Sequence, residues 1–375
     1  MPKTPKVAII ILTWNKKEYV LTLLGCIKSL DYKNYDVIVV DNASTDGTVK
    51  ALRKSFPDIH LIVNSENLGG TGGFNSGMKY ALGKGSYDYL WLLDNDVEVD
   101  KRALSTLVDV LESSKEIAIA GSAMYNLTDK DKLLELGYFI DLERGRFNNN
   151  MPPEPTQKGF VIVDSVSSCS LCVSTEAIAD VGIWDESYFI YCDDVDWNIR
   201  FGEKGYKIAC VPGSKIWHVP WLFKIGFTTA YYSNRNMMYL MSKHLPFPKK
   251  ITGMIYKELS LIILSLRLLR SGDSLHSIVV LRALTDFFDR KFGDFGDDDY
   301  IKSLEEKDTG QSYYEWTKTL LKLGVKNVTY SLTVLGSVIR SASVEFLRGI
   351  FRKLPDETRL KIIKRLNDHY LSKRL

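Results

Sequence analysis

Short apolar runs alternate with amphipathic segments over the first hundred residues. Residues 7–12 read VAIIIL and residues 36–40 read DVIVV, and such β-branched runs are typical of strands buried on both faces. The alternation predicts strands at residues 7–12, 36–40, 60–63 and 87–93, and helices at residues 17–30, 46–56 and 73–82. The resulting β-α-β-α-β-α-β order predicts an α/β fold, with a mostly parallel sheet and flanking helices.

Polar, small or acidic residues follow each of the four predicted strands. They are Thr13 and Asn15, then Asp41, then Asn67 and Gly70, and finally Asp94, Asn95 and Asp96. In sheets of this kind, ligands bind at the carboxyl ends of the strands. We therefore expect these residues to share one rim of the sheet that collects the chemistry.

The pattern changes further along the chain. Residues 102–245 mix helical and strand-like segments, and residues 148–155 (NNNMPPEP) favour a loop. From Pro246 the pattern is helical to the end, with a turn expected at residues 292–299. We therefore predict an α/β domain over residues 1–245 and a helical domain over residues 246–375.

Charge and cysteine content narrow the classes of function. A net charge of +3 over 375 residues is too small for a nucleic-acid binder. Residues 340–375 hold ten basic and four acidic residues, which fits contact with an anionic membrane or a solvated helix face equally. Five cysteines fit a reducing compartment, and Cys169 and Cys172 lack the second pair of a zinc site, so we interpret them as buried thiols. With neither a leader nor an apolar run of ~20 residues, the expected location is cytoplasmic.

The segment Asp94-Asn95-Asp96 is a candidate metal site. Two carboxylates at positions i and i+2 after a strand can share a hard divalent cation such as Mg²⁺ or Mn²⁺. Such an ion can bridge a diphosphate and stabilise its charge as it leaves. The alternative is a solvated turn, but three neighbouring polar strand ends favour the metal site.

Two further features fit a nucleotide ligand at the same rim. Asp41 follows a buried strand, and its carboxylate can accept a hydrogen bond from a nucleobase N–H or cap the next helix. Residues 69–77 (GGTGGFNSG) allow close approach of backbone N–H groups to a phosphate or sugar. This segment matches neither the P-loop nor the dinucleotide fingerprint, because no Gly-Lys-Ser/Thr follows and Asn75 replaces the third glycine.

A second acidic segment, Asp193-Asp194-Val195-Asp196, precedes Trp197 and opens a predicted helix. Crowded carboxylates raise the pKa of at least one member, and a carboxylate there is a candidate general base. The alternative is a helix cap with surface acids. His218 lies in an apolar, aromatic stretch, where it is either a satisfied core histidine or a ligand.

Together these motifs resemble the family-2 glycosyltransferases with a GT-A fold, over about residues 7–240. The resemblance implies that Asp41 binds the nucleobase and that Asp94 and Asp96 hold the metal and the donor diphosphate. It implies that Asp194 is the catalytic base of an inverting reaction. The branch most similar in appearance comprises galactofuranosyl- and rhamnosyltransferases, in which a downstream histidine completes the metal site, here His218. One departure is Cys192, where that branch has Trp or Phe.

The resemblance also implies the remaining contacts and partners. It assigns the donor to Thr13, Asn15, Asp41, Asn67, Gly70, Asn75, Asp94 and Asn95, and the acceptor to Trp184, Asp193, Asp196 and Trp197. Expected donors are UDP-galactofuranose or dTDP-rhamnose, and the expected acceptor is a hydroxyl of a lipid-linked glycan or polysaccharide. Residues 231–236 (YYSNRN) match a family segment in which Arg235 either holds the diphosphate or packs the domain junction.

Two hypotheses stay open for the helical region and two for the whole chain. The apolar residues 259–269 and 327–339 are too short to span a bilayer; they either lie in a membrane interface on its inner face or form a bundle or homo-oligomer contact. The alternatives to an enzyme of this family are a catalytically silent nucleotide-sugar-binding module and a nucleotidyltransferase. The acidic residues and His218 argue against the first, and Thr13-Trp14-Asn15 replaces the glycine-rich loop expected of the second.

Overall fold

The computed structural model describes residues 4–148, 159–219, 226–296 and 316–320. The chain divides into two compact units, Met1–Thr319 and Leu320–Leu375, and the description below concerns the first. The second unit lies outside the described residues apart from Leu320. It includes the predicted apolar segment 327–339 and the basic residues 340–375.

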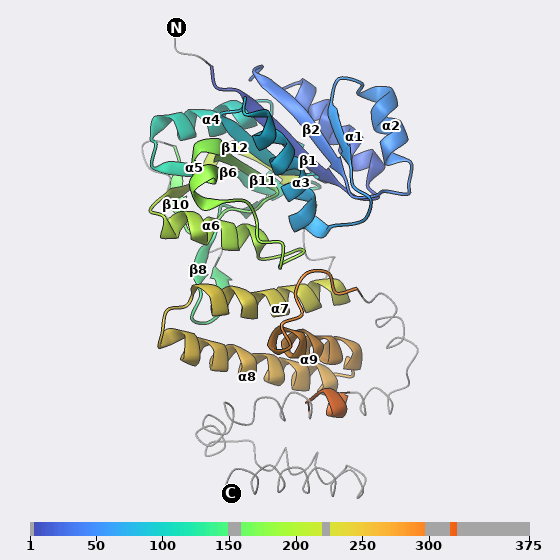
Figure 1. Cartoon of the computed structure of the whole chain (residues 1–375), viewed down its shortest axis with the longest axis vertical. Coiled ribbons are helices and arrows are strands. Elements are labelled where there is room, and N and C mark those ends of the chain that lie inside the picture. The colour runs from blue at the N-terminus through green and yellow to red at the C-terminus, as the bar shows by residue number, and fades with distance from the viewer. Residues whose placement is uncertain (1–3, 149–158, 220–225, 297–315, 321–375) are drawn as a thin grey trace, which may run out of the picture. The chain divides into compact units, whose positions relative to one another are not determined.

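The first four predicted strands are present and parallel, as expected (Figure 1). Strand β1 (Val7–Thr13) lies between β2 (Tyr35–Asp41) and β4 (Tyr89–Asp94), and β3 (His60–Val63) pairs with the outer side of β2. The intervening helices are α1 (Lys17–Lys28), α2 (Thr48–Ser55) and α3 (Gly69–Lys84). The predicted crossover pattern therefore builds this half of the sheet.

The other half of the sheet is mixed. Strand β11 (Ser170–Ser174) runs antiparallel between β4 and β6 (Ile117–Asn126), and β12 (Lys207–His218) runs parallel to β6. Three short strands extend this sheet: β5 (Val97–Val99), β7 (Leu133–Glu135) and β10 (Val161–Val163). Strands β8 (Phe139–Asp141) and β9 (Arg146–Asn148) form a separate small hairpin. The helices of this half are α4 (Ala103–Ser113), α5 (Thr175–Val181) and α6 (Asp193–Glu203). The predicted α/β class, with a mixed and mostly parallel sheet, is confirmed.

The central strands are apolar throughout because both faces of the sheet are covered. Along β1, Ile9 and Ile11 pack with residues of α1 and α4, whereas Ala8 and Ile10 pack with residues of α3, α5 and α6. Alternate side chains of a strand point to opposite faces, so a strand buried on both sides needs a continuous apolar run. This is why residues 7–12 carry no polar position.

Helix α3 begins at Gly69, inside the glycine-rich segment, rather than at the predicted residue 73. A Cβ atom on Gly73 would lie 2.3 Å from Leu12, and one on Gly77 would lie 2.4 Å from Ile10. Both glycines therefore let the helix approach the sheet closely. Gly69, with φ +69°, likewise allows a close approach to Phe189, whose carbonyl oxygen would lie 2.3 Å from an added Cβ. Close helix packing accounts for these three glycines.

Three long helices follow the mixed sheet: α7 (Phe227–His244), α8 (Lys249–Arg270) and α9 (Ser274–Phe288). Helix α7 packs against α8 and α9. The predicted domain boundary near residue 245 falls in the link between α7 and α8, which lies inside the first compact unit, Met1–Thr319. The predicted apolar segment 259–269 lies within α8, where Leu261 is buried and Ile263 and Leu264 are exposed. Among the described helices, none has the length and apolar character needed to cross a membrane.

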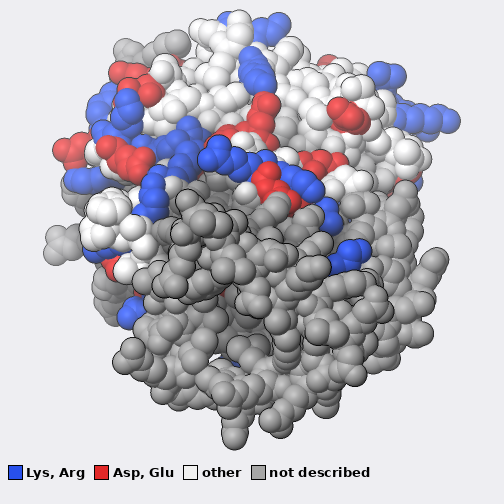
Figure 2. Space-filling view, turned by 60° about the horizontal axis from the view of Figure 1, so that its bottom comes forward, with Lys and Arg blue, Asp and Glu red and all other residues white. Residues whose placement is uncertain are grey.

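On one face of the molecule, basic side chains lie among acidic ones. Figure 2 shows Lys and Arg side by side with Asp and Glu over the described part of that face. A single-sign basic surface is what an anionic membrane attracts most strongly. The described part of this face is not such a surface, and the basic residues 340–375 lie outside the described residues.

Candidate active site

The carboxyl ends of β1, β2 and β4 meet at one rim, as the sequence predicts. Thr13 is the register partner of Asp41, and Leu12 is the partner of Asp94. Asn95 Nδ2 donates a hydrogen bond to Thr13 Oγ1 at 2.9 Å, which ties the β4 end to the β1 end. The strand register thus places Thr13, Asp41, Asp94 and Asn95 beside one another.

Asp41 carries a buried acceptor atom with no partner among the described residues. Its Oδ1 accepts a hydrogen bond from Ser44 N at 2.8 Å, which holds the turn after β2. Its Oδ2 is buried and has no hydrogen-bond partner. Because a buried carboxylate oxygen without a donor is costly, its presence marks a place where a ligand N–H or O–H can bind.

Three of the residues predicted to bind the donor form hydrogen bonds within the protein. Asn15, in a left-handed conformation with φ 50°, accepts a hydrogen bond from Thr45 N at 2.7 Å. Asn67 Oδ1 accepts one from Gly69 N at 3.0 Å. Asn75 is fully buried, donates to Trp184 O at 3.0 Å and accepts from Trp184 N at 3.1 Å. Its side chain therefore fastens α3 to the segment before α6, which is a structural contact rather than a surface for the donor.

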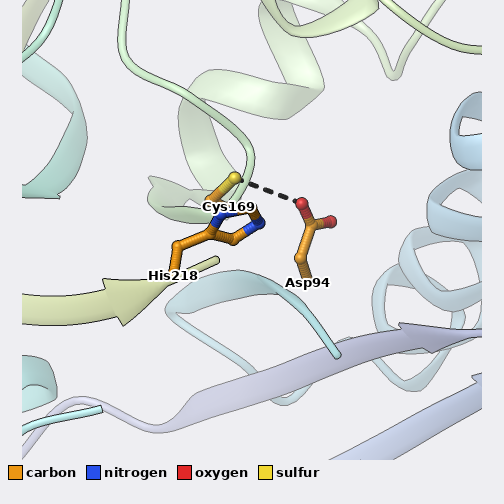
Figure 3. Close-up of side chains that lie close together, drawn as sticks. All are labelled: Asp94, Cys169 and His218. Carbon is orange, nitrogen blue, oxygen red and sulfur yellow. Dashed lines mark hydrogen bonds between the residues drawn. The ribbon is translucent and has the colours of Figure 1, made fainter. Parts of the chain in front are cut away.

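The predicted metal ligands converge on a fourth residue that the sequence did not indicate. Asp94, Cys169 and His218 offer one ligand atom each, and these atoms lie within 4.8 Å of one another. Figure 3 shows the three side chains facing a common centre, with Cys169 Sγ donating to Asp94 Oδ2 at 3.2 Å. Asp96 Oδ1 lies 3.2 Å from His218 Nε2. Asp94, Asp96, Cys169 and His218 thus form one cluster, which we call the rim cluster.

The orientation of His218 suits metal binding. His218 Nδ1 is hydrogen-bonded to the Val219 carbonyl, which requires a proton on Nδ1 and leaves Nε2 directed toward Asp96. A metal-binding histidine usually donates its other ring N–H in this way, because the hydrogen bond fixes both tautomer and orientation. The donor set of carboxylates and imidazole therefore fits a divalent cation such as Mn²⁺.

The charges of the rim cluster lead to the same conclusion. Burial, reinforced by the charge of Asp96, raises the pKa of Asp94 to about 6. Burial alone would lower the pKa of His218, but the hydrogen bond to Asp96 and the charges of both aspartates outweigh it and raise this pKa. Crowded carboxylates that hold protons in this way are the groups that a bound cation would stabilise in the charged form.

Asp193 and Asp194 begin helix α6 and face different neighbours. Thr71 Oγ1 donates to Asp193 Oδ2 at 2.6 Å, and burial together with the charge of Asp194 raises the pKa of Asp193 to about 7. Asp194 is half-buried, accepts a hydrogen bond from Ser168 N at 3.1 Å, and has a pKa raised chiefly by burial. The charge of Asp194 also acts on Asp94. Asp194 therefore lies within electrostatic reach of the rim cluster.

Asp196 points away from the rim into a buried ionic cluster. Its carboxylate lies 2.9 Å from Arg200 Nε, 2.8 Å from Lys243 Nζ and 2.8 Å from His244 Nε2. Burial would raise the pKa of Asp196, but the hydrogen bonds from His244 and Lys243 outweigh burial and lower it. A fully buried carboxylate with these partners has no face for an acceptor, so we correct its predicted role to joining α6 with α7.

The two predicted acceptor tryptophans belong to the core. Trp197 is fully buried and donates from Nε1 to Gly182 O at 2.7 Å. Trp184 is 3% exposed and packs between Phe74 and Trp197, with ring centroids 5.2 and 5.9 Å away. Neither side chain reaches the surface, so the predicted acceptor contact is replaced by a packing role for both. These aromatic residues are present in the sequence because they pack in the core beneath α6.

Residues 187–192 form a strained turn directly before Asp193. Phe189, Tyr191 and Cys192 adopt left-handed conformations with φ between 64° and 67°, which is unfavourable for side chains of this size. Asn236 Nδ2 donates to the carbonyls of Tyr188, Ile190 and Tyr191 at 2.7–2.9 Å. The three contacts between α7 and this turn hold the strained backbone in place.

Arg235 has one of the two roles left open by the sequence. It is 1% exposed, and its guanidinium donates to Gly293 O at 2.8 Å and to Tyr188 O at 3.0 Å. It also lies over the rings of Tyr231 and Tyr232. These contacts place Arg235 in the packing between the α/β region and the helices rather than on a diphosphate.

Comparison with known proteins finds a family model that matches part of the α/β region. The model described as "Glycosyl transferase family 2" matches residues 8–168, which contain Asp41, Asp94 and Asp96. Residues 8–168 are therefore similar to a family 2 glycosyltransferase domain. A crystal structure of GalNAc-T7 with UDP, GalNAc and Mn²⁺ has a TM-score of 0.51 at 12% identity, over 69% of this chain and 55% of that one. The likeness shows that the two share the GT-A fold.

Two curated relatives are similar over a larger part of the chain. Galactofuranosyltransferase GlfT2 of Mycolicibacterium smegmatis is 26% identical over 288 residues, covering 69% of this chain and 44% of the relative. The amylovoran biosynthesis glycosyltransferase AmsB of Erwinia amylovora is 26% identical over 216 residues, covering 54% of this chain and 66% of the relative. The match thus spans between 44% and 66% of the length of these relatives.

Proposed function

We propose that this protein is an inverting, metal-dependent glycosyltransferase. It moves a sugar from a nucleoside diphosphate donor to a hydroxyl group of a lipid-linked glycan or polysaccharide. The observation that carries the proposal is the rim itself, where the unpartnered Asp41 Oδ2, the rim cluster and Asp194 occur together in a family 2 domain. Each of the three offers one part of the chemistry.

Donor binding is assigned to the ends of β1, β2 and β4. Asp41 Oδ2 accepts an N–H of the nucleobase, a bond strengthened by the charge on the carboxylate. Asp94, Asp96 and His218 hold Mn²⁺ or Mg²⁺, which supplies positive charge to the diphosphate. Thr13 and Asn95, already bonded to each other, lie between these two places and orient the donor.

Asp194 acts as the general base. The acceptor hydroxyl gives its proton to the Asp194 carboxylate while its oxygen forms a bond to the anomeric carbon. The bond from that carbon to the diphosphate breaks on the opposite face, and the electron pair leaves with the diphosphate, so configuration inverts. The raised pKa of Asp194 brings this base closer to neutral pH, which improves proton transfer there.

Galactofuranose and rhamnose remain the proposed sugars, carried by UDP and dTDP. The galactofuranosyltransferase named above supports the first, at 26% identity. A polysaccharide acceptor is supported by AmsB and by the poly-β-1,6-N-acetyl-D-glucosamine synthase of Staphylococcus aureus, 24% identical over 213 residues. We place the reaction at the inner face of the cell membrane, where lipid-linked glycans are assembled. Membrane contact and self-association stay predictions.

A donor screen tests the proposal. Purified protein is incubated with Mn²⁺ or Mg²⁺ and a panel of nucleotide sugars, and release of the free nucleoside diphosphate is followed with and without EDTA. We expect metal-dependent release from one donor, with Asp41→Ala weakening donor binding. Nucleotide binding without release, even with glycan acceptors added, would instead favour a silent nucleotide-sugar-binding module, and absence of binding would refute both.

A further inference from the structure

Cys169 lies against the rim cluster because of strand register. Ser170 is the register partner of Leu93 in the antiparallel pair β11–β4, so the next residue back along β11 lies beside Asp94. The backbone N–H of Asp94 faces the Cys169 carbonyl at 3.4 Å, and Cys169 Sγ lies 3.2 Å from Asp94 Oδ2. The thiol therefore has a fixed position within the cluster, at 2% exposure.

Cys169 differs from the other buried cysteines of the sheet. Cys172 and Cys210 are fully buried within the two apolar clusters of the core, one on each face of the sheet. Cys169 belongs to the same apolar cluster as Cys172, but its Sγ also contacts a carboxylate and lies in one group of ligand atoms with an imidazole. A thiol whose only role is to fill core volume has no need of such polar neighbours, since packing is what decides the place of most buried cysteines.

We propose that Cys169 Sγ is a direct ligand of the divalent metal held by Asp94, Asp96 and His218. The proposal rests on the proposed metal site and adds a ligand to it. Two donors of one tetrahedral ion, at roughly 2.1 and 2.3 Å from the metal, lie about 3.6 Å apart. Cys169 Sγ and Asp94 Oδ2 are already 3.2 Å apart, and the ligand atoms of Asp94, Cys169 and His218 all lie within 4.8 Å of one another, so side-chain movements of up to about 1 Å bring them onto one ion.

Binding breaks the S–H bond, and the proton passes to solvent while sulfur keeps the electron pair that it donates to the metal. No electron is transferred and no other reactant is needed. A bound divalent cation is the largest local charge and deprotonates a coordinating thiol. A site with one sulfur, one nitrogen and carboxylate oxygens favours Zn²⁺, Cd²⁺ and Co²⁺ over Mg²⁺ more strongly than one without sulfur. Cys169 therefore determines the metal preference of the enzyme.

Metal binding by the full chain tests this without relying on turnover. Co²⁺ is titrated into the protein, and the near-ultraviolet sulfur-to-cobalt charge-transfer band is recorded for wild type, Cys169→Ser and Cys26→Ser. Cys26 is a half-buried thiol on α1 and serves as the control. We expect the band in wild type and in Cys26→Ser, and its loss in Cys169→Ser. Calorimetry should show Cd²⁺ affinity falling roughly 100-fold in Cys169→Ser and Mn²⁺ affinity falling less than about tenfold.

X-ray absorption of the wild-type protein loaded with Zn²⁺ gives a test that needs no variant, with a metal–sulfur distance of about 2.3 Å expected. An unchanged cobalt band and unchanged Cd²⁺ affinity in Cys169→Ser would overturn the proposal. Mn²⁺ binding by a wild type that shows neither the band nor the sulfur shell would refute the Cys169 ligand alone and leave the proposed function intact. Failure of wild type to bind any of these ions would overturn the metal site as well.

Discussion

The chain carries two acidic segments that resemble each other in sequence but are arranged differently in space. Asp94 is the last residue of β4, Asn95 and Asp96 follow it, and all three have partners at the rim. In the segment 193–196, by contrast, the three aspartates separate. Asp193 bonds to α3, Asp194 accepts a hydrogen bond near the rim cluster, and Asp196 joins the helices beyond.

The secondary structure beneath each segment explains the difference. The residues directly after a strand that ends at the rim all lie at one edge of the sheet, where ligands bind. Successive residues of an α-helix instead point about 100° apart. Asp193, Asp194 and Asp196 lie in the first turn of α6, so they cannot all face the same ligand. In such a helical cluster, one carboxylate can be functional while another is structural.

The sharpest test of this division is Asp194→Asn. If Asp194 is the base, the amide cannot take the proton, and we expect the turnover number to fall by about 10³-fold with donor affinity nearly unchanged. Asp193→Asn is the matched control, because Asp193 is adjacent but bonded to Thr71, and it should lower turnover by less than about tenfold. Steady-state kinetics with calorimetry of donor binding measures both. Equal losses in the two variants would mean that the segment acts as a unit.

The reverse behaviour is expected of Asp196→Ala. Removing this fully buried carboxylate leaves Arg200 without its ion-pair partner and Lys243 with Asp185 alone, and breaking a buried ion pair costs about 3–5 kcal/mol of stability. Thermal unfolding should therefore shift to a much lower temperature. Lys204→Ala, which removes an exposed partner of Asp180, is the control and should change stability by less than about 1 kcal/mol. A stable Asp196→Ala protein with impaired acceptor use would restore the predicted acceptor role.

Asn236→Ala tests how the strained turn supports the second segment. The asparagine holds three carbonyls of the turn that precedes Asp193, so its loss leaves buried acceptors unsatisfied at a cost of about 2 kcal/mol. The turn should then relax, and turnover should fall about tenfold, with little change in donor affinity because the donor contacts lie on other strands. Asn234→Ala is the control, because Asn234 lies on the same helix and its side chain donates to Ala230 O within that helix. A loss of stability without loss of turnover would limit Asn236 to a packing role.

These contrasts also explain which parts could be predicted from the sequence. The strands with their carboxyl ends were predictable, because β-branched apolar runs and the residues that follow them are local features. The place of Cys169 beside Asp94 could not be predicted, because it depends on the antiparallel register of β11 with β4. No local sequence pattern indicates that register. The structural roles of Asp196 and Trp197 could not be predicted for a related reason. Their partners Lys243 and Gly182 lie 47 and 15 residues away in the sequence, so no local pattern indicates these contacts.

The pH dependence of stability separates the two kinds of carboxylate most finely. Lys243 contacts both Asp185 and Asp196, and the pKa of Asp185 is lowered to about 2 because its hydrogen bonds to Lys243 and Ser187 outweigh burial. A lowered folded-state pKa gives stability that is present above the unfolded value near 4 and is lost as pH falls toward 2. Asp94 and Asp193 have raised pKa values of about 6 and about 7, so their folded forms hold protons more tightly than the unfolded chain.

Their stabilisation is complete below pH ~4 and is lost as pH rises toward 7. In EDTA, we therefore expect stability to rise between pH 2 and 4 and to decline between pH 4 and 7, each by on the order of 1–2 kcal/mol. Mn²⁺ should reduce the decline, since it favours the charged form of Asp94, and Asp193→Asn should reduce it independently of metal. Lys243→Met should flatten only the acidic limb. Chemical denaturation across this pH range measures the rise, the decline and the effects of Mn²⁺ and of both variants. If Mn²⁺ did not reduce the decline, Asp94 would not be a ligand of the ion.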